Sequence, residues 1–216
     1  MKTNSKVAII GLGNIGKVVA ANLAHSNTNF IAADRSIAKA NELAEKLGAI
    51  VQPGEISAAV KQADILILSI PFGEIGIFLH EHAADLEGKI IVDPSNPIAP
   101  DENGGFKKII AAEKSAGEIN AEFLPKNAKL AKAMGTLGAG SLGAAAHQKP
   151  EAAALFYATD DQSIDPQIEE LIVNTGFEPV RVGNLTQSIR IEVFGDLHEF
   201  GALGKTVTRT EAQSKI

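Results

Sequence analysis

The chain has 216 residues, of which 45% are hydrophobic and 21% are charged, and its formal net charge is −6 at pH 7. This is enough apolar material for one large domain, or for a large domain joined to a small one. The negative balance, without any cluster of Lys and Arg, argues against a nucleic-acid partner. The sequence contains no cysteine, which excludes disulfides, thiol catalysis and thiolate metal sites.

No apolar stretch approaches the ~20 residues of a membrane span. The first residues are followed by an apolar run that is too short for a signal-peptide core. We therefore expect a cytoplasmic protein with no membrane partner.

The N-terminal region carries a glycine-rich turn between a strand and a helix. An apolar run at 7–10 predicts the strand, and residues 11–16 read Gly-Leu-Gly-Asn-Ile-Gly. Gly11 permits a tight turn, Gly13 lacks the Cβ that would keep a pyrophosphate away, and Gly16 lets the following helix pack closely. That helix, expected at 14–25 with Asn14 and Ile15 in its first turn, would direct free N–H groups at the phosphates. The pattern predicts a dinucleotide site.

The second strand, expected at 29–33, ends at the position that selects between NAD and NADP. Asp34 suits a ribose 2′-hydroxyl and repels a phosphate. Arg35, Ser36 and Lys39 could instead clamp the 2′-phosphate of NADP. These signals conflict, and we expect NADP by a small margin, with NAD left open.

The alternation of strands and helices continues along the chain. We expect a helix at 36–47, strands at 49–51, 64–70 and 89–92, and intervening helices at 55–62 and 74–86. Five strands with helical crossovers predict an α/β fold with a doubly wound parallel sheet, the Rossmann architecture.

The rhythm breaks after residue 97, where prolines and a Gly-Gly pair interrupt the pattern. Here we expect a loop with one helix around 106–116, and then a strand near 128–134. Strands at 155–159 and 178–183 around a helix at 166–174 predict a smaller α/β unit. We place a dinucleotide-binding domain at 1–140 and a smaller C-terminal unit that completes the cleft at 141–216.

Ligands of open parallel sheets bind beyond the carboxyl ends of the strands. Besides the glycine turn, these ends are expected to bring to the cleft Ser69 to Phe72, Asp93 to Pro97, Met134 to Gly138, and Asp160 with Asp161. The set contains no Ser/His/Asp constellation and no acid/base pair, so we assign no catalytic residue. Hydride transfer between two cofactors needs apposed rings and excluded water more than a proton shuttle.

Two further groups of residues have plain structural interpretations. His80 and His82 lie about 200° apart around a helix, so we expect an exposed helical face and no metal site. The segment 190–198 alternates charged and apolar residues. It fits structural ion pairing, which we favour, or the lining of a second pocket.

Five motifs in order carry a family resemblance: the turn at 11–16, Ser69-Ile70-Pro71, and the segments 92–97, 132–139 and 156–161. Together they resemble the NADP oxidoreductase family that includes the deazaflavin (coenzyme F420) dependent NADP reductases. The resemblance implies a nicotinamide nucleotide in the N-terminal half, with a second cofactor, deazaflavin F420 or a flavin, stacked on it.

By position in these motifs, Ile70, Pro71 and Ala133 would lie near the nicotinamide. Met134 to Leu137 would lie near the acceptor ring, and Ser69 and Asn96 would be further cofactor contacts. One position departs from the family, in which a small polar residue followed by Arg typically receives the 2′-phosphate, because Asp34 precedes Arg35 here.

Three functions are compatible with the sequence. The first is an NADP-dependent oxidoreductase that passes hydride to a deazaflavin or flavin-like acceptor. The second is an NAD(P)-dependent dehydrogenase of a small carbonyl or imine substrate. The 3-hydroxyacid dehydrogenases of similar N-terminal sequence carry a catalytic lysine after a glycine-rich segment, and residues 135–143 contain none. Pyrroline carboxylate reductases have an all-helical C-terminal half, whereas two strand-like runs flank a helix here, so this second function is disfavoured. The third is a nucleotide-sensing protein without turnover. In each case the predicted partners are small molecules, and a homodimer is left open.

Overall fold

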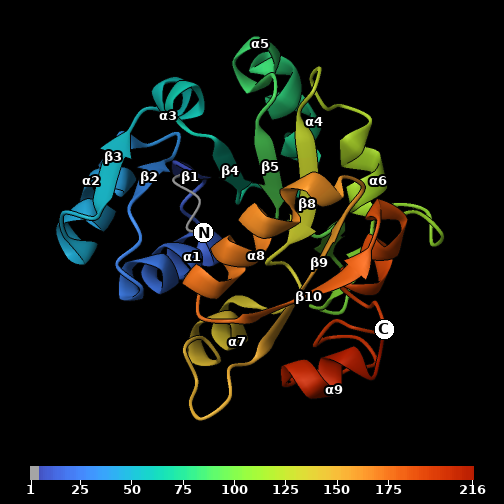
Figure 1. Ribbon diagram of the computed structural model, residues 1–216. Coiled ribbons are helices and arrows are strands. Elements are labelled where there is room, and N and C mark those ends of the chain that lie inside the picture. Colours follow the sequence, from blue (N-terminus) through green and yellow to red (C-terminus); the bar gives the residue numbers. More distant parts are fainter. Residues whose placement is uncertain (1–4) are drawn as a thin grey trace.

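The computed structural model describes residues 5–216 as one sheet with helices on both faces, together with a separate hairpin (Figure 1). The sheet strands are β1 Val7–Ile10, β2 Phe30–Ala33, β3 Val51–Gly54, β4 Ile65–Leu68, β5 Ile90–Asp93, β8 Lys129–Ala133, β9 Ala154–Thr159 and β10 Glu178–Gly183. The hairpin consists of β6 Ile98–Pro100 and β7 Phe106–Lys108.

The α-helices are α1 Asn14–His25, α2 Ile37–Leu47, α3 Ile56–Gln62, α4 Phe72–Glu81, α5 Ala83–Leu86, α6 Ala116–Ala121, α7 Ala139–Ala144, α8 Asp165–Asn174 and α9 Arg209–Gln213. Two 3₁₀ helices complete the fold, η1 Gln162–Ile164 and η2 Leu185–Arg190. Within residues 5–216 no helix combines the length and the apolar character needed to cross a membrane.

The sheet has the order β10-β9-β8-β5-β4-β1-β2-β3. The six strands from β8 to β3 in this order run parallel, which confirms the predicted doubly wound Rossmann fold. β9 and β10 are parallel to each other, but β9 pairs with β8 in the antiparallel direction. The sheet is therefore mostly parallel, with two reversed strands at one edge.

The reversal of β9 corrects the expected position of Asp160 and Asp161. In an antiparallel pair the carboxyl end of one strand lies beside the amino end of the other. Asp161 accordingly lies beside Lys129, the first residue of β8, with 2.8 Å between Nζ and Oδ2. Both aspartates lie at the edge of the sheet away from the glycine turn, so their expected place in the cleft is wrong.

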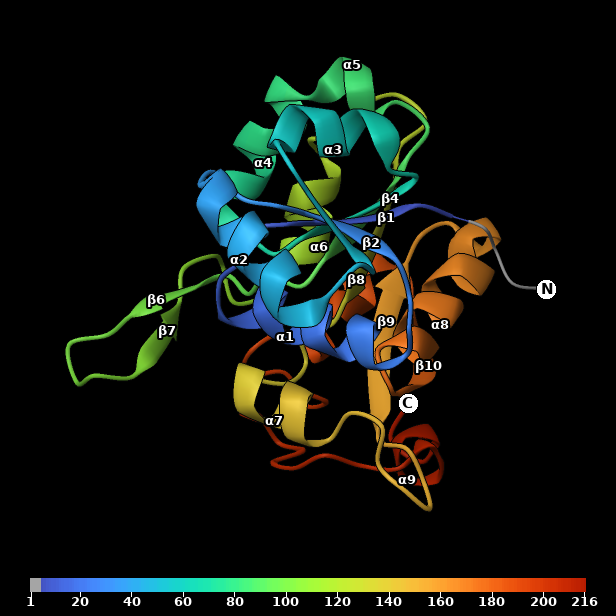
Figure 2. The same ribbon diagram turned by 90° about the vertical axis from the view of Figure 1, so that its left-hand side faces the viewer.

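Alternate residues of the parallel strands pack on opposite faces of the sheet. Val7 and Ile9 face a cluster built on α1, α2 and α8, whereas Ala8 and Ile10 face a cluster built on α3, α4 and α5. Figure 2, in which the sheet is seen nearly edge-on, shows α1 below the sheet and α3, α4 and α5 above it. Burial on both faces explains why these strands are continuously apolar.

The helix expected at 106–116 is wrong. Residues 98–108 form the β6–β7 hairpin, which projects from the body of the molecule in Figure 2, and α6 starts only at Ala116. The carboxylate of Asp101 accepts hydrogen bonds from the backbone of Asn103 and Gly105, at 2.7 and 2.9 Å, and so fixes the hairpin turn. Ser115 begins α6 with a capping box.

The expected boundary at residue 140 falls inside α7. Strands from both sides of this position belong to one sheet, through the pairing of β8 with β9. The smaller C-terminal unit that we propose therefore continues the sheet of the N-terminal part. It adds a cluster of its own around Phe156, Val180 and Leu197.

Candidate cofactor-binding site

The glycine turn after β1 is closed by backbone contacts at its two ends. Gly11 has a φ of +91°, and its N–H donates to the carbonyl of Ala33 at 2.8 Å. A Cβ at Gly11 would collide with the carbonyl oxygen of Ser69, and one at Gly16 would collide with the carbonyl oxygen of Gly11. Both positions therefore require glycine, because the chain passes too close for a side chain.

Gly13 differs from its two neighbours in the motif. A Cβ added there would meet no atom of the described residues within 4 Å, so the space above it is open. Gly13 is also the N-cap of the 12-residue helix α1, and it offers no side chain to the first N–H groups. The first turn of α1 carries no acidic side chain either. The helix thus presents its positive end and unpaired donors to this space, an arrangement that suits an anion.

Asp34 connects the end of β2 to the glycine turn. Its Oδ2 accepts from the N–H of Leu12 at 2.9 Å, its Oδ1 accepts from the N–H of Ser36 at 3.0 Å, and Lys39 Nζ lies 3.4 Å from Oδ1. Burial by itself raises the pKa of Asp34, but the two backbone donors and Lys39 outweigh it and hold the pKa below its usual value. Asp34 is therefore ionised near neutral pH and orders the turn.

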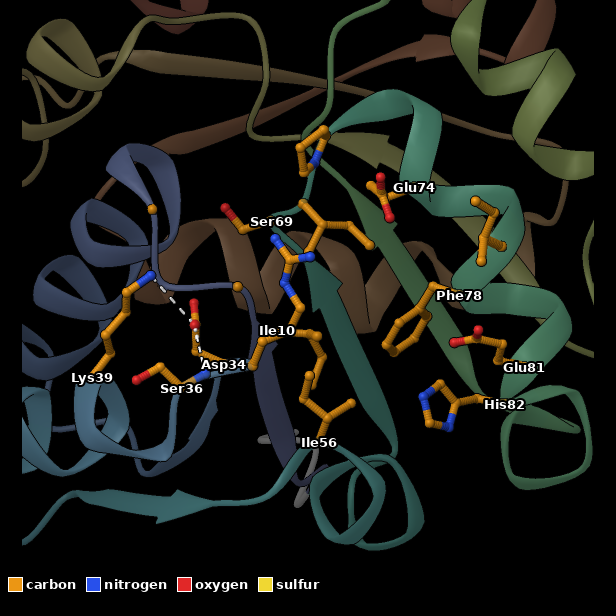
Figure 3. Close-up of a pocket in the computed structure, with 16 residues that line it drawn as sticks. Ile10, Asp34, Ser36, Lys39, Ile56, Ser69, Glu74, Phe78, Glu81 and His82 are labelled. Atoms are coloured by element: carbon orange, nitrogen blue, oxygen red, sulfur yellow. Dashed lines mark hydrogen bonds and ion pairs between the residues drawn. The ribbon is translucent and has the colours of Figure 1, made fainter.

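A cavity of about 510 Å³ opens beside the glycine turn, between the ends of β1 and β4 and helix α4 (Figure 3). This volume falls in the range of small-molecule sites. Its lining combines apolar side chains with a few charged groups: Ile10, Gly11, Gly13, Asp34, Arg35, Ser36, Lys39, Ile56, Ser69, Ile70, Pro71, Glu74, Ile77, Phe78, Glu81 and His82.

The cavity brings together part of the predicted site. The predicted residues that line it are Gly11, Gly13, Asp34, Arg35, Lys39, Ser69, Ile70 and Pro71. Those outside its lining are Asn14, Ile15, Gly16, Asn96, Ala133 and Met134. Ala133 and Met134 are 1% and 0% exposed, because both side chains pack in the core cluster together with Leu137 and Leu142.

Sequence reasoning missed the contribution of α4 and α3 to this cavity. The residues missed as lining are Ile56, Glu74, Ile77, Phe78, Glu81 and His82. The sequence pattern that could have identified the α4 residues is the spacing of Glu74, Phe78 and His82. At i, i+4 and i+8 these residues share one face of a helix. The ring centroids of His82 and Phe78 lie 4.6 Å apart, and His82 is half-buried. The predicted exposure is therefore confirmed for His80 and wrong for His82.

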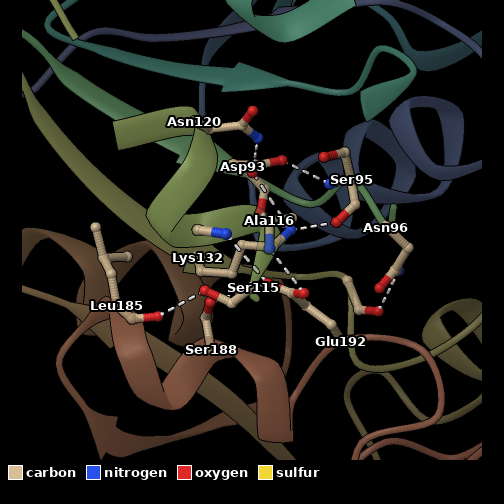
Figure 4. A network of polar contacts seen from close by, with 12 residues as sticks. Asp93, Ser95, Asn96, Ser115, Ala116, Asn120, Lys132, Leu185, Ser188 and Glu192 are labelled. Atoms are coloured by element: carbon tan, nitrogen blue, oxygen red, sulfur yellow. Dashed lines mark hydrogen bonds and ion pairs between the residues drawn. The ribbon is translucent and has the colours of Figure 1, made fainter. Parts of the chain in front are cut away.

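A buried polar network fixes the loop that follows β5 (Figure 4). Lys132 Nζ lies 3.4 Å from Asp93 Oδ2, with side chains 3% and 0% exposed. Lys132 also donates to the carbonyl oxygens of Asp93 and Ser95, and Asn120 donates to Asp93 Oδ2 at 2.8 Å. A buried ion pair is tolerated when its remaining hydrogen-bonding capacity is used, as it is here. The network ties the ends of β5 and β8 together.

Residues 192–201, which we call the strap, pack on the same loops. The side-chain oxygen of Asn96 accepts from the N–H of Val193 at 2.7 Å, and the Asn96 amide donates to the carbonyl of Gly135 at 2.9 Å. His198 Nε2 also contacts that carbonyl at 2.9 Å, and its Nδ1 accepts from the N–H of Phe200 at 3.0 Å. These contacts place the strap over the carboxyl ends of β5 and β8.

The structural interpretation of 190–198 is supported by its pairings. Arg190 makes a bidentate contact with Asp196, at 2.8 to 3.1 Å. Glu192, 2% exposed, accepts from the N–H groups of Ala116 and Gly117 at 2.9 and 3.1 Å, and from the Ser188 hydroxyl at 2.9 Å. The side chain of Glu192 thus fastens the strap to α6 and η2 (Figure 4).

The glycine turn, the acid after β2 and the mostly parallel sheet define a class, the proteins with a Rossmann-type dinucleotide-binding fold. Within it, residues 6–97 match the sequence model of the family described as "NADP oxidoreductase coenzyme F420-dependent". This match confirms the predicted resemblance over these residues. Over residues 6–97 the chain is therefore similar to NADP-dependent oxidoreductases. No curated protein matches the chain.

Solved structures share the fold over most of the chain. A hypothetical protein from Sinorhizobium meliloti is 28% identical, with a TM-score of 0.83, and the match covers 95% of this chain and 96% of that one. A protein provisionally assigned as an F420-dependent NADP reductase, from Arthrobacter, is 19% identical, with a TM-score of 0.72 and coverage of 86% and 87%. A pyrroline-5-carboxylate reductase from Coxiella burnetii is 15% identical, with a TM-score of 0.65 and coverage of 90% and 65%.

Proposed function

We propose that the protein transfers a hydride between NADP(H) and a flat, flavin-like acceptor, which would be a deazaflavin or a flavin. The observation that carries the nucleotide part is the open space above Gly13, at the bare positive end of α1 and beside the 510 Å³ cavity. This open space can accommodate a pyrophosphate, and the positive end of α1 suits its negative charge. When bound, NADPH supplies the hydride from carbon 4 of its nicotinamide.

The residues around Asp34 favour NADP, with NAD still open. Both carboxylate oxygens of Asp34 already accept backbone N–H groups, and Lys39 lies close enough to offset the negative charge. Arg35 is exposed in the cavity lining, where its guanidinium can reach a 2′-phosphate. The repulsion expected from an aspartate at this position is thereby reduced.

The acceptor part of the proposal is supported by the family match and by the character of the carboxyl edge. The loop after β4 brings Ile70 and Pro71 to the cavity, and the charged groups of Asp93, Lys132 and Glu192 are already paired in buried contacts. In this role the chain's residues bind and orient two rings and exclude water, and no proton shuttle is required.

The test combines nucleotide binding with an acceptor panel. Gly13→Val places a branched side chain in the open space. The φ of Gly13 is −79°, so a side chain there requires no left-handed backbone. Calorimetric titration should show NADPH binding to the wild type and none to the folded Gly13→Val variant. Gly140→Val, an exposed glycine with equally free surroundings in α7, is the matched control and should bind NADPH normally.

The panel measures NADPH oxidation with deazaflavin, flavins, and small carbonyls and imines. Reduction of a flat-ring acceptor by the wild type supports the proposal. Turnover of a carbonyl or imine alone would establish the dehydrogenase alternative, and binding without any turnover would establish a nucleotide sensor. Unchanged NADPH affinity in Gly13→Val would refute the nucleotide site itself.

A further inference from the structure

The residues expected to contact the second ring are not available to a ligand. Met134 and Leu137 are 0% and 4% exposed, so their side chains belong to the core. The strap, which covers the ends of β5 and β8, carries two aromatic side chains that are exposed. Phe194 is 50% exposed and Phe200 is 63% exposed.

The strap holds these two rings on a fixed backbone. Two hydrogen bonds join it to the loops beneath it. The N–H of Val193 donates to the side-chain oxygen of Asn96, and the N–H of Glu199 donates to the carbonyl of Thr136 at 3.3 Å. It is also folded tightly on itself, because a Cβ at Gly201 would collide with the carbonyl oxygen of Gly195. Rings carried on such a backbone lose little conformational freedom when they bind a partner.

Phe194 also has an unfavourable conformation. Its φ is +73°, a left-handed value that bulky residues rarely adopt. In this conformation the ring of Phe194 stays half exposed. An observed conformational outlier at an exposed aromatic residue is a reason to look for a role in binding.

The position of the two rings indicates what they bind. β4, β5 and β8 are neighbours in the sheet, and Pro71, just after β4, lines the nucleotide cavity. Phe194 follows Val193, whose N–H donates a hydrogen bond to Asn96 in the loop after β5. The ring of Phe200 lies within 3.1 Å of the position that a Cβ at Gly138 would take. The Phe200 ring therefore lies beside the loop after β8, and Phe194 follows the strap residue that contacts the loop after β5. Both loops neighbour the loop after β4, which lines the proposed nucleotide site.

We propose that Phe194 and Phe200 form the apolar platform that holds the flat heteroaromatic ring of the hydride acceptor. The inference rests on the proposed function and adds the side chains that recognise the acceptor. Aromatic side chains pair with flat rings through stacked or edge-to-face contacts, which supply affinity without any charged partner.

The experiment replaces the rings without removing their apolar character. Phe194→Leu and Phe200→Leu are compared with Phe106→Leu, the matched control, which alters a 58% exposed ring on the β6–β7 hairpin. Binding of oxidised deazaflavin and of FMN to the NADP⁺-saturated protein is measured by fluorescence titration, in separate arms that distinguish the two acceptors. NADPH affinity is measured by calorimetry, and mass in solution by sedimentation.

Each strap variant should weaken acceptor binding by about threefold to tenfold, the range that follows from aromatic pairing. NADPH affinity and the mass in solution should not change, and Phe106→Leu should bind the acceptor as the wild type does. Unchanged acceptor affinity in both strap variants, or an equal loss in the control, would overturn the platform. So would a smaller assembly in the strap variants, because the rings would then pack against a second copy of the chain.

A failure of the proposed function is distinguishable from a failure of the platform. If the wild type binds NADPH but neither flat-ring acceptor, the proposed acceptor class is wrong and the platform falls with it. If the wild type binds and reduces an acceptor while the strap variants behave like the wild type, the platform alone is wrong.

Discussion

Asp34 and Arg35 are adjacent residues with opposite consequences for the choice of cofactor. The aspartate is committed to the turn through Leu12 and Ser36, whereas the Arg35 guanidinium is exposed to the cavity. The choice between NADP and NAD thus depends on how strongly the charge of Asp34 repels a bound 2′-phosphate. Lys39 lies close to the Asp34 carboxylate, and we propose that Arg35 is therefore the stronger influence on the choice of cofactor.

Arg35→Ala should weaken NADPH binding by about 1.5–3 kcal/mol, the range for a hydrogen bond to a charged group, and NADH binding far less. Calorimetric titration of both nucleotides measures the difference. Arg209→Ala, an exposed arginine paired with Glu178 far from the cavity, is the control and should change neither affinity. Equal losses for both nucleotides, or a wild-type preference for NADH, would instead identify Asp34 as the selector.

His198 should make stability depend on pH. Burial lowers the pKa of His198 below its usual 6.5, against the opposing effects of Gly135 and Glu199. Its Nε2–H donates to Gly135 and its Nδ1 accepts from Phe200, so the neutral ring satisfies both contacts. Protonation would remove the acceptor and bury a charge.

The unfolded chain therefore binds this proton more readily than the folded one. The contribution of His198 is complete above about pH 6.5 and is lost as the pH falls toward the lower folded pKa, by up to about 1.4 kcal/mol per pH unit. Urea unfolding between about pH 7.5 and pH 5 should show a smaller loss of stability in His198→Gln than in the wild type. Identical pH dependence in the two proteins would contradict this account.

Glu192 determines how two elements are held, because its carboxylate accepts donors from both α6 and η2. Glu192→Gln removes the charge and leaves one of these buried donors without an acceptor. We expect the free energy of unfolding to fall by about 1–3 kcal/mol, measured by urea titration. Glu211→Gln, at an exposed helix cap, should cost less than half as much. Comparable effects of the two substitutions would argue against the role of Glu192 as a fastener.

The elements predicted well are those whose signals are local. The bounds expected for α1 agree with Asn14–His25, since a glycine turn before it and the loss of apolar periodicity after it mark both ends. The hairpin was missed because Phe106 and Ile109, spaced as on a helical face, outweighed the turn formed by Asp101. The direction of β9 depends on how the chain returns to the sheet, which no local pattern records.

The candidate site, like the fold, was predictable where its residues are close together in the sequence. The half built by the βαβ unit at the N-terminus, including Gly13 and Asp34, follows from contiguous sequence and lines the cavity. Met134 was placed at the correct strand end, but its side chain packs in the core cluster with Leu137 and Leu142, which no local pattern records. The role that we propose for Phe194 likewise depends on tertiary packing.

At the scale of the whole molecule, one sheet edge gathers every part of the proposed chemistry. The loops after β1, β2 and β4 line the cavity that we propose as the nucleotide site, and the loops after β5 and β8 lie next to them under the strap. All of these loops lie in the proposed domain 1–140, whereas the strap comes from the proposed unit 141–216, and both parts stand on the same sheet. We propose that the cleft brings two rings together directly.

Stereospecifically deuterated NADPH tests this central claim most directly. Direct transfer between rings held about 3–3.5 Å apart carries the label from carbon 4 of the nicotinamide to the acceptor. With deazaflavin as acceptor, the label is held on carbon and does not exchange with water. We predict that mass spectrometry will find the deuterium in the reduced deazaflavin. Deuterium released to solvent, or carried into a carbonyl substrate while no flavin-like acceptor is reduced, would contradict the account.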